Sequence, residues 1–510
     1  MLVKTELDHP TDDPSLPSYR HPLLRELGED LQRAYDAYHC LRGCKDRYLP
    51  QEPKEPDDAY KARLGRSTFS DFYRSSITAF AGVLSKFSLI EPPESLEDAS
   101  DNIDLEGNSL IAWWQQVDSW MLRDGGVALC VEMPDGLPGS AAEEVAMGRR
   151  PYLLARPRSK VLNWRVSVTD GVEALERCTL LELTEEPDGD FGVKMVPRYR
   201  VIGRGEWMLF EIERNASNDL TAVMVDQGQY LGANGQPLPV VPVVWYASDQ
   251  AGFGQGELPL RQVVEHSIEH YQQRSDLREK THRLALPVPV RIGATPPAPG
   301  EARRPLVIGP NSVIDLEPGG SFSFAEPSCA SLGEQRAQIA EVEKLISRQT
   351  LGFLYGDPGG NKTATQAGLE SAQTESTITR IAQRKSSAMQ SLMQIWTLYT
   401  GEELEPGAGL SMASSLFERP MEAADVSQLQ QLTGGDKLVS RQSAIEELQR
   451  RGKLTVTTSP EEELERIREE EPEPADPVGL NDLGGLSLPL PVKPMQPDGP
   501  DDGDGPDPET

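Results

Sequence analysis

The stretch SIEHYQQRSDLREKTHRLALPVPV, residues 267–290, joins a long polar helix to a proline-rich segment. Its pattern predicts one helix from about residue 258 to residue 285. At the rise of an α-helix, such a helix is about 42 Å long. The chain leaves the helix at LALPVPV, residues 284–290, and stays rich in proline and glycine up to residue 327.

Short strands and two further helices are expected after this point. The strand candidates are residues 288–292, 306–308, 312–316 and 321–325. Ser331 and Glu334 have the spacing of a capping box, in which two side chains satisfy free N–H groups at the start of a helix. We therefore expect a helix from Ser331 to about Thr350. The glycine-rich loop LGFLYGDPGGNK, residues 351–362, then leads into a longer helix over residues 363–400.

The chain before the polar helix has the pattern of a mixed α/β lobe. Apolar residues recur at helical spacing between residues 59 and 87 and again between residues 111 and 121. From residue 151 to residue 247 the pattern changes to short β-like runs, such as YLLARP and VVPVVWYA, separated by glycine and Asn-Gly turn signals. The sequence therefore predicts an α+β fold.

The chain after residue 400 is expected to end in small helices and an acidic tail. Asp425 and Ser440 have the character of helix N-caps. After about residue 471, acidic residues, proline and glycine leave too little apolar surface to offset the entropy of ordering the chain. We expect a helical module at 425–470 and a disordered tail at 471–510.

The composition excludes several classes of protein. A chain of 510 residues is too long for one hydrophobic core and should form several lobes. Its net charge of −31 is opposite in sign to the charge of a surface that binds nucleic acid, although a negatively charged protein would let DNA pass without holding it. Five cysteines include Cys40 and Cys44, but no second pair completes a four-ligand site, so we expect reduced thiols in a cytosolic compartment. The sequence contains no run of about 20 apolar residues and begins without the apolar region of a signal peptide.

The same polar helix contains a possible metal motif. His266, Glu269 and His270 match H-x-x-E-H, the inverted zinc-peptidase signature, in which two imidazoles lie one helical turn apart beside a carboxylate. Such a site also needs an acidic ligand downstream, and no later helix presents an isolated glutamate in an apolar setting. Arginine and lysine are frequent between residues 274 and 283, which indicates a solvated or intersubunit face. We therefore predict no metal and no other cofactor.

The stretch GDPGGNKT, residues 356–363, is similar to a nucleotide-binding P-loop but departs from it. Gly356, Lys362 and Thr363 fit the pattern, whereas Asn361 replaces its second glycine. The preceding RQTLGFLY has the character of a helix end, and a P-loop follows a buried strand. No serine–histidine–aspartate or cysteine–histidine set has a suitable spacing either. We expect a glycine-rich loop between two long helices, in a protein that is not an enzyme.

Segments spread over roughly residues 20–455 resemble, in their order, the portal proteins of tailed bacteriophages, in a branch long described only as a domain of unknown function. These segments are YKARLGRSTFSDFYRSSITAFAGVLSKF, LLARPRSKVLNWRV, LPVVPVVWY, SIEHYQQRSDLREKTHRLALPVPV, LVIGPNSVIDLEPGGSFSFAEPS and NKTATQAGLESAQTESTITRIAQRKSSAMQSLMQIW. The resemblance implies a ring, in this family usually of twelve subunits, at one vertex of the capsid.

The resemblance also implies a division into the parts of a portal subunit, an α+β fold with a mixed α/β wing, long stem helices, a small β-containing clip and a helical crown. The expected parts are a flexible N-terminal arm at 1–19, a wing at 20–255, stem helices at 256–285 and 328–351, a clip at 286–327, a tunnel loop at 352–362, a long helix returning to the wing at 363–424, a crown at 425–470 and an acidic tail at 471–510.

The resemblance further implies the partners and the place of the protein. The ring would pass double-stranded DNA without sequence specificity during packaging and ejection. It would dock the terminase large subunit, later bind the head–tail adaptor, and meet the major capsid and scaffolding proteins, with no membrane partner. It would assemble in the host cytoplasm and remain at the portal vertex of the virion. Asn361 and Lys362 would line the DNA channel, and a solvated loop charge is the other interpretation of Lys362.

Two other functions stay open at this point. A zinc metallopeptidase would use His266, Glu269 and His270, and stoichiometric zinc in the purified protein would reveal it. A scaffold protein of similar layout outside phages is the third possibility. The mass of the protein in solution, or an electron micrograph with rings, would separate it from a portal.

Overall fold

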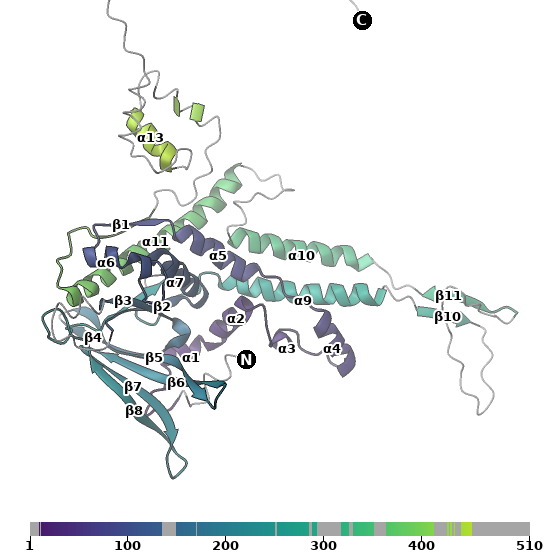
Figure 1. Cartoon of the computed structure of the whole chain (residues 1–510). Coiled ribbons are helices and arrows are strands. Elements are labelled where there is room, and N and C mark those ends of the chain that lie inside the picture. Colours follow the sequence, from purple (N-terminus) through teal and green to yellow (C-terminus); the bar gives the residue numbers. More distant parts are fainter. Residues whose placement is uncertain are drawn as a thin grey trace, which may run out of the picture. The chain divides into compact units, whose positions relative to one another are not determined.

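The chain divides into two units in the computed structural model, Met1–Phe417 and Glu418–Thr510. The structure describes residues 10, 12–134, 149–169, 171–249, 252–284, 288–292, 318–325, 330–350, 364–412, 426–427, 429–430, 433 and 440–450. The first unit combines helices with antiparallel β-sheets (Figure 1). The predicted α+β fold is confirmed.

The first unit begins with helices. The boundaries of α7 (Leu110–Asp124) follow from its caps, because Ser109 Oγ accepts a hydrogen bond from the backbone N–H of Ala112 (3.3 Å) and Gly125 ends the helix with a φ of 79°. Its Trp114 side chain is fully buried. The other elements of this part are α1 (Pro22–Glu26), α2 (Gly28–Tyr38), α3 (Lys45–Tyr48), α4 (Asp57–Arg66), α5 (Phe72–Leu84), β1 (Phe87–Ile90), α6 (Glu94–Asp98) and the 3-10 helix η1 (Ser100–Asn102).

A three-stranded antiparallel sheet lies at the centre of the core. β2 (Gly126–Glu132) pairs with β3 (Tyr152–Pro157) on one side and β9 (Val243–Ala247) on the other, and every residue of β2 is buried. The helix α7 and the later helix α11 (Ala364–Thr400) both pack against this sheet. A Cβ atom at Gly126 would lie 2.2 Å from the Trp245 ring, so glycine is needed for β9 to approach this closely.

A second antiparallel sheet has five strands. Their order is β4 (Val161–Thr169), β5 (Val172–Asp188), β6 (Gly192–Gly203), β7 (Glu206–Arg214) and β8 (Leu220–Gln229), with the 3-10 helix η2 (Arg158–Lys160) just before β4. β5 and β6 continue to pair out to Asp188↔Gly192, beyond the ends of their neighbours β4 and β7. The strand-rich section predicted between residues 151 and 247 is confirmed. The sequence pattern did not indicate that its strands belong to two sheets.

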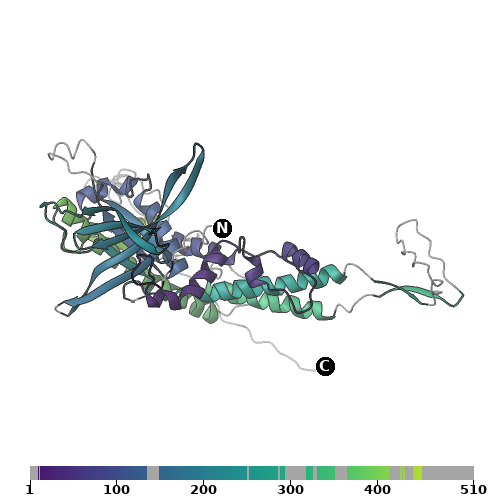
Figure 2. The same cartoon turned by 90° about the horizontal axis from the view of Figure 1, so that it is seen from below.

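A two-helix arm extends from these sheets and helices. α9 (Arg261–Leu284) lies between α10 (Ala330–Gln349) on one side and α2, α3 and α4 on the other (Figures 1 and 2). Beyond α9, β10 (Val288–Ile292) and β11 (Ser321–Ala325) form an antiparallel ribbon. The predicted first helix and the strands at 288–292 and 321–325 are confirmed. The strands predicted at 306–308 and 312–316 lie outside the described residues.

The capping box predicted at Ser331 is wrong. α10 begins at Ala330, so Ser331 already lies inside the first turn of the helix. Its Oγ atom accepts a hydrogen bond from Lys280 Nζ of α9 (2.5 Å). The serine therefore joins the two helices of the arm instead of capping one of them.

The longest helix leads back into the core. α11 (Ala364–Thr400), which was predicted over residues 363–400, buries a stripe of apolar side chains that includes Ile378, Met389 and Trp396. After it, β12 (Gly409–Met412) pairs antiparallel with β1. No helix in the described part of the chain is both long and apolar enough to cross a membrane.

The N-terminal segment is packed closer to its start than predicted. A flexible arm was expected over residues 1–19, but Leu16 and Ser18 are buried. The ring of His21 stacks on Trp164 of β4, with 3.9 Å between the ring centroids. Pro14, Leu16 and Tyr19 line one cavity together with residues of β4 to β8, so this part of the segment lies against the five-stranded sheet.

The second unit contains α13 (Arg441–Arg450). The N-cap predicted at Ser440 is confirmed, because its Oγ atom accepts a hydrogen bond from the backbone N–H of Ser443 (3.0 Å). Asp425 and the predicted tail at 471–510 lie outside the described residues.

Candidate functional site: the two-helix arm and its ribbon

The arm is fixed to the rest of the first unit along one side of α9. Buried apolar side chains on α9 are Val263, Val264, Ile268 and Tyr271. Three ion pairs join α9 to α2 and α4, namely Arg261–Asp30 (3.0 Å), Glu265–Arg33 (2.9 Å) and Glu279–Arg66, with the α9 residue given first. The hydroxyls of Ser67 and Ser275 also form a buried hydrogen bond (2.8 Å). These contacts attach most of the length of α9 to α2 and α4.

By contrast, α10 is held mainly by α9. Its buried stripe consists of Ile339, Val342 and Ile346. Gln349 Nε2 donates a hydrogen bond to Gln262 Oε1 of α9 (2.6 Å) near the base of the arm. The remaining faces of α10 are exposed along most of the helix. Because helix stability in water comes chiefly from packing, these exposed faces make α10 the least supported long helix of the arm.

The structure separates the residues of the H-x-x-E-H motif. His266 Nδ1 lies 3.4 Å from Glu269 Oε2, on a partly exposed side of α9. His270 is fully buried, where its ring meets Phe72 edge to face and its Nε2 lies 3.0 Å from Glu343 Oε1 of α10. Sequence reasoning did not identify Glu343 as a partner. Among the described residues, no group of three or more His, Cys, Asp or Glu side chains is arranged to hold a metal.

The ribbon after α9 exposes apolar side chains. The rings of Phe322 and Phe324 meet edge to face (5.2 Å between centroids). Phe324 is 47% exposed and Ile292 is 61% exposed. A two-stranded ribbon is marginally stable in water, and its edges carry unpaired N–H and C=O groups. The ribbon is therefore suited to binding another chain.

A buried ion pair joins α11 to the core. Lys385 Nζ lies 2.8 Å from Asp118 Oδ2 of α7 and donates a hydrogen bond to the carbonyl of Leu84 (2.8 Å). Tyr246 donates its O–H to Asp118 Oδ1 (2.9 Å), and Lys385 Nζ lies 4.8 Å from the centroid of the Trp114 ring. Burial raises the pKa of Asp118 and lowers the pKa of Lys385, while their mutual attraction opposes both shifts. Sequence reasoning missed both residues.

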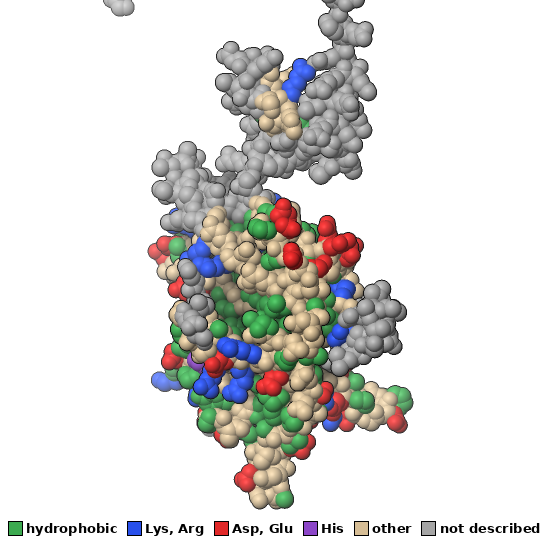
Figure 3. All heavy atoms as spheres, turned by 90° about the vertical axis from the view of Figure 1, so that its left-hand side faces the viewer, with side chains coloured by type: hydrophobic (Ala, Val, Ile, Leu, Met, Phe, Trp, Pro, Cys, Tyr) green, Lys and Arg blue, Asp and Glu red, His purple; other side chains and the backbone are tan. Residues whose placement is uncertain are grey.

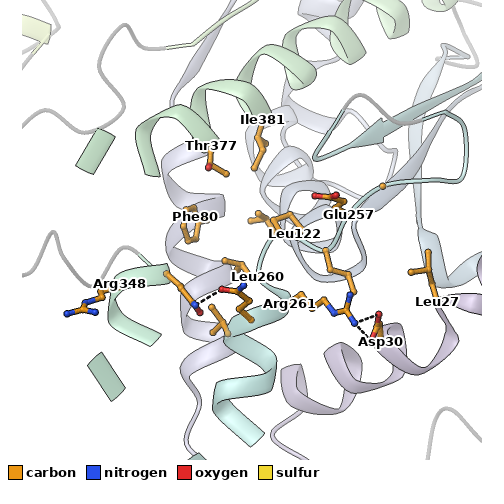
Figure 4. A pocket seen from close by; sticks show the side chains of 16 residues that line it. Leu27, Asp30, Phe80, Leu122, Glu257, Leu260, Arg261, Arg348, Thr377 and Ile381 are labelled. Carbon is orange, nitrogen blue, oxygen red and sulfur yellow. Dashed lines mark hydrogen bonds and ion pairs between the residues drawn. The ribbon is translucent and has the colours of Figure 1, made fainter. Parts of the chain in front are cut away.

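A cavity of about 590 Å³ lies where the arm meets the core (Figure 4). Apolar side chains from α5, α7 and α11, namely Phe80, Leu122 and Ile381, line it together with the start of α9. The Arg261–Asp30 ion pair lies at one of its edges. The described lining residues contain no histidine, cysteine or serine that could act as a nucleophile or base. The cavity therefore offers space at a helix junction, lined by apolar side chains and by the carboxylates of Asp30 and Glu257.

Charges of both signs are present on one face of the molecule. Figure 3 shows acidic, basic and apolar side chains interspersed over the face that is turned to the viewer. Asn361 and Lys362, predicted to line a DNA channel, lie outside the described residues, as does the P-loop-like stretch.

Comparisons with known proteins match part of the chain by sequence and most of it by structure. The model of a family described as a domain of unknown function (DUF4055) matches residues 259–400. This match starts just before α9 and ends at the last residue of α11. A search of curated proteins gives no match.

Chains of gene transfer agent particles are similar in structure. One, from the neck of an empty particle computed with C6 symmetry, is 16% identical, with a TM-score of 0.42, over 79% of this chain and 96% of the other. A second, from the virion of a native particle, is 14% identical, with a TM-score of 0.40, over 82% and 98%. A third, from the neck of a native particle computed with C12 symmetry, has a TM-score of 0.37 at 14% identity, over 78% and 95%. These TM-scores lie below 0.5, which is too low for the likeness to carry a functional argument.

Proposed function

We propose that this chain is the subunit of a portal, a ring at one capsid vertex through which viral DNA is packaged and ejected. In this proposal, the ring docks the terminase motor during packaging and the tail adaptor afterwards. The observation that carries it is the arm, in which α10 runs back along α9 and an exposed ribbon continues from the helices. A monomer leaves most of α10 and the apolar side chains Phe324 and Ile292 of the ribbon in water, whereas a ring supplies a neighbour on each side of every subunit.

The order of elements along the chain supports the division that the resemblance to portal proteins implies. The proposed parts are the wing, residues 20–255 with the later part of α11; the stem, α9 and α10 within residues 256–285 and 328–351; the clip, the ribbon within residues 286–327; the tunnel loop at 352–362; and the crown at 425–470. The proposed wing contains both larger sheets, and α10 of the proposed stem is exposed along most of its length.

The charge of the chain suits a conduit better than a DNA-binding surface. Each phosphate contact by lysine or arginine adds salt-dependent affinity, which would hold a moving strand in place. A net charge of −31 per subunit works against such contacts. The exposed faces of α10 carry Glu334 and Glu341 as well as Arg336 and Lys344, so neither sign dominates there. We further propose that Asn361 and Lys362 line the channel.

The location of the chain in a particle tests this proposal. Antibodies against the chain, coupled to gold and applied to opened particles from cells that carry the sequence, are expected to label one vertex of each capsid. An antibody against the major capsid protein provides the control, because it labels the whole shell. Label distributed over the shell, or found only in the particle-free fraction, would contradict a portal.

A further inference from the structure

A groove lies between α2 and the first half of α9, on a different side of α9 from α10. It has a volume of about 950 Å³, and we name it the α2–α9 groove. Glu265, His266 and Glu269 form its α9 wall, while Arg33 of α2 and Arg47 of α3 contribute to the other. It therefore contains two of the three residues of the H-x-x-E-H motif.

The charges of the groove differ between its two walls. Arg33 already pairs with Glu265 (2.9 Å), and its side chain stays 44% exposed. Glu269 is 48% exposed and accepts a hydrogen bond from Gln273 (2.9 Å), but no lysine or arginine of the described residues pairs with it. Arg47 is 54% exposed and pairs with Asp36 (2.6 Å). The α9 wall thus presents an exposed carboxylate that has His266 beside it but no lysine or arginine partner among the described residues. The opposite wall presents two exposed guanidinium groups together with the exposed carboxylate of Glu29.

The outer face of α10 complements both walls. This face, opposite the stripe that packs on α9, carries Ala337, Ala340, Glu341 and Lys344, all of which are exposed. Glu341 and Lys344 are three residues apart, so their directions around the helix differ by about 60°. One of the two charges can therefore point to one wall of a groove and the other charge to the opposite wall. The two alanines allow the backbone of α10 to approach a surface closely.

The α10 helix of the same chain does not occupy the groove. It meets α9 through the side of His270, whose Nε2 lies 3.0 Å from Glu343, and Glu343 lies on the part of α10 that faces α9. His270 is fully buried by this contact, whereas Glu269 beside it remains exposed in the groove. An α10 helix that enters the groove must belong to another molecule.

We propose that the α2–α9 groove of one subunit receives the outer face of α10 from a second copy of this chain, with Lys344 paired to Glu269 and Glu341 directed to Arg33 and Arg47. This inference rests on the proposed ring and specifies one of its contacts. The contact joins two different surfaces, so each subunit keeps one of them free for the next copy. Repetition of such a contact closes a ring when the rotation between subunits allows it.

Charge exchange tests the pairing. Glu269→Lys and Lys344→Glu each place like charges in the contact, and each is expected to raise the protein concentration needed for half-maximal ring formation about tenfold at low salt. The combination of both changes restores an opposite pair and is expected to return that concentration to within about threefold of the wild-type value. Matched controls are Glu213→Lys on β7 and Lys61→Glu on α4, which exchange exposed charges outside the groove.

Ring formation is measured as the mass distribution in solution. The melting temperature is measured as a control, because an unchanged value shows that a variant still folds. Rings that form normally in both single variants would overturn the groove contact and leave the proposed function standing. Failure of the double variant to recover would also overturn the pairing. A wild-type protein that never forms rings would overturn both. If Lys344→Glu changed DNA retention and left ring formation unchanged, the outer face of α10 would belong to the channel, which would contradict the groove contact.

Disulfide crosslinking is a second test, and its result does not depend on how strongly the subunits assemble. Glu269→Cys combined with Lys344→Cys is expected to give, on oxidation, a ladder of disulfide-linked multimers that either single change lacks. A crosslink confined to single chains would contradict a contact between copies.

Discussion

Replacing Lys385 by methionine is expected to lower the free energy of unfolding of the first unit by about 3–5 kcal/mol. Lys385 and Asp118 are both fully buried, and Lys385 Nζ is the only described cation within hydrogen-bond distance of that carboxylate. Removal of the ammonium leaves Asp118 as a buried charge with one remaining hydrogen bond, from Tyr246. A charge left unpaired in a protein interior costs far more than the pair contributes.

Urea unfolding followed by tryptophan fluorescence measures this effect, because Trp114 lies against Lys385. Two variants make the result specific. Asp118→Asn combined with Lys385→Met removes both charges and is expected to recover most of the loss, to within about 1–2 kcal/mol of the wild type. Lys86→Met, at an exposed position nearby, is expected to change the stability by less than about 0.5 kcal/mol. If Lys385→Met were as stable as the Lys86 control, the buried pair would not hold α11 to the core.

Replacing residues 286–327 by a short Gly/Ser linker is expected to abolish binding of the terminase large subunit. The same change should weaken the rings or make their size heterogeneous. The change removes β10 and β11, whose ribbon is too small to be stable alone and gains partners when the same segment of a neighbour lies beside it. It also removes the exposed Phe324 and Ile292, the kind of apolar surface that binds a partner.

Ring formation is measured by electron microscopy, and terminase capture is measured separately by pull-down with the terminase large subunit that the proposed function requires. A matched control replaces only residues 293–317 by a short Gly/Asn turn, which keeps both strands of the ribbon. That control is expected to form rings as the wild type does. A variant without residues 286–327 that still packages DNA at the normal rate would refute the assignment of this segment as the clip.

The long helices could be predicted from the sequence because helical spacing of apolar residues is a local signal. The expected helix over 363–400 and the observed α11 (Ala364–Thr400) differ by one residue at the start. Helix caps were predicted less reliably, since a serine at an expected helix start caps α13 at Ser440 but does not cap α10 at Ser331, although Glu334 completes the capping-box pattern there. The hydroxyl of Ser331 bonds instead to Lys280 of a neighbouring helix, a contact that no local pattern contains.

The contacts between distant segments could not be predicted in this way. Asp118 and Lys385 are 267 positions apart, and only the fold brings them together. One signal was present, because Lys385 lies one turn after Ile381 and one turn before Met389 in an otherwise apolar stripe. A lysine in such a stripe indicates a buried partner without identifying it. Likewise, the spacing of His266 and His270 suggested a shared site, but the packing of α10 against α9 gives the two rings different neighbours.

The assembly state of the purified full-length chain shows whether the protein forms a portal ring. Negative-stain electron microscopy combined with mass photometry is expected to show closed rings with a central hole. Twelve chains of 56.1 kDa would give particles of about 670 kDa. Monomers of 56.1 kDa at every protein concentration, or open filaments in place of closed rings, would contradict a portal.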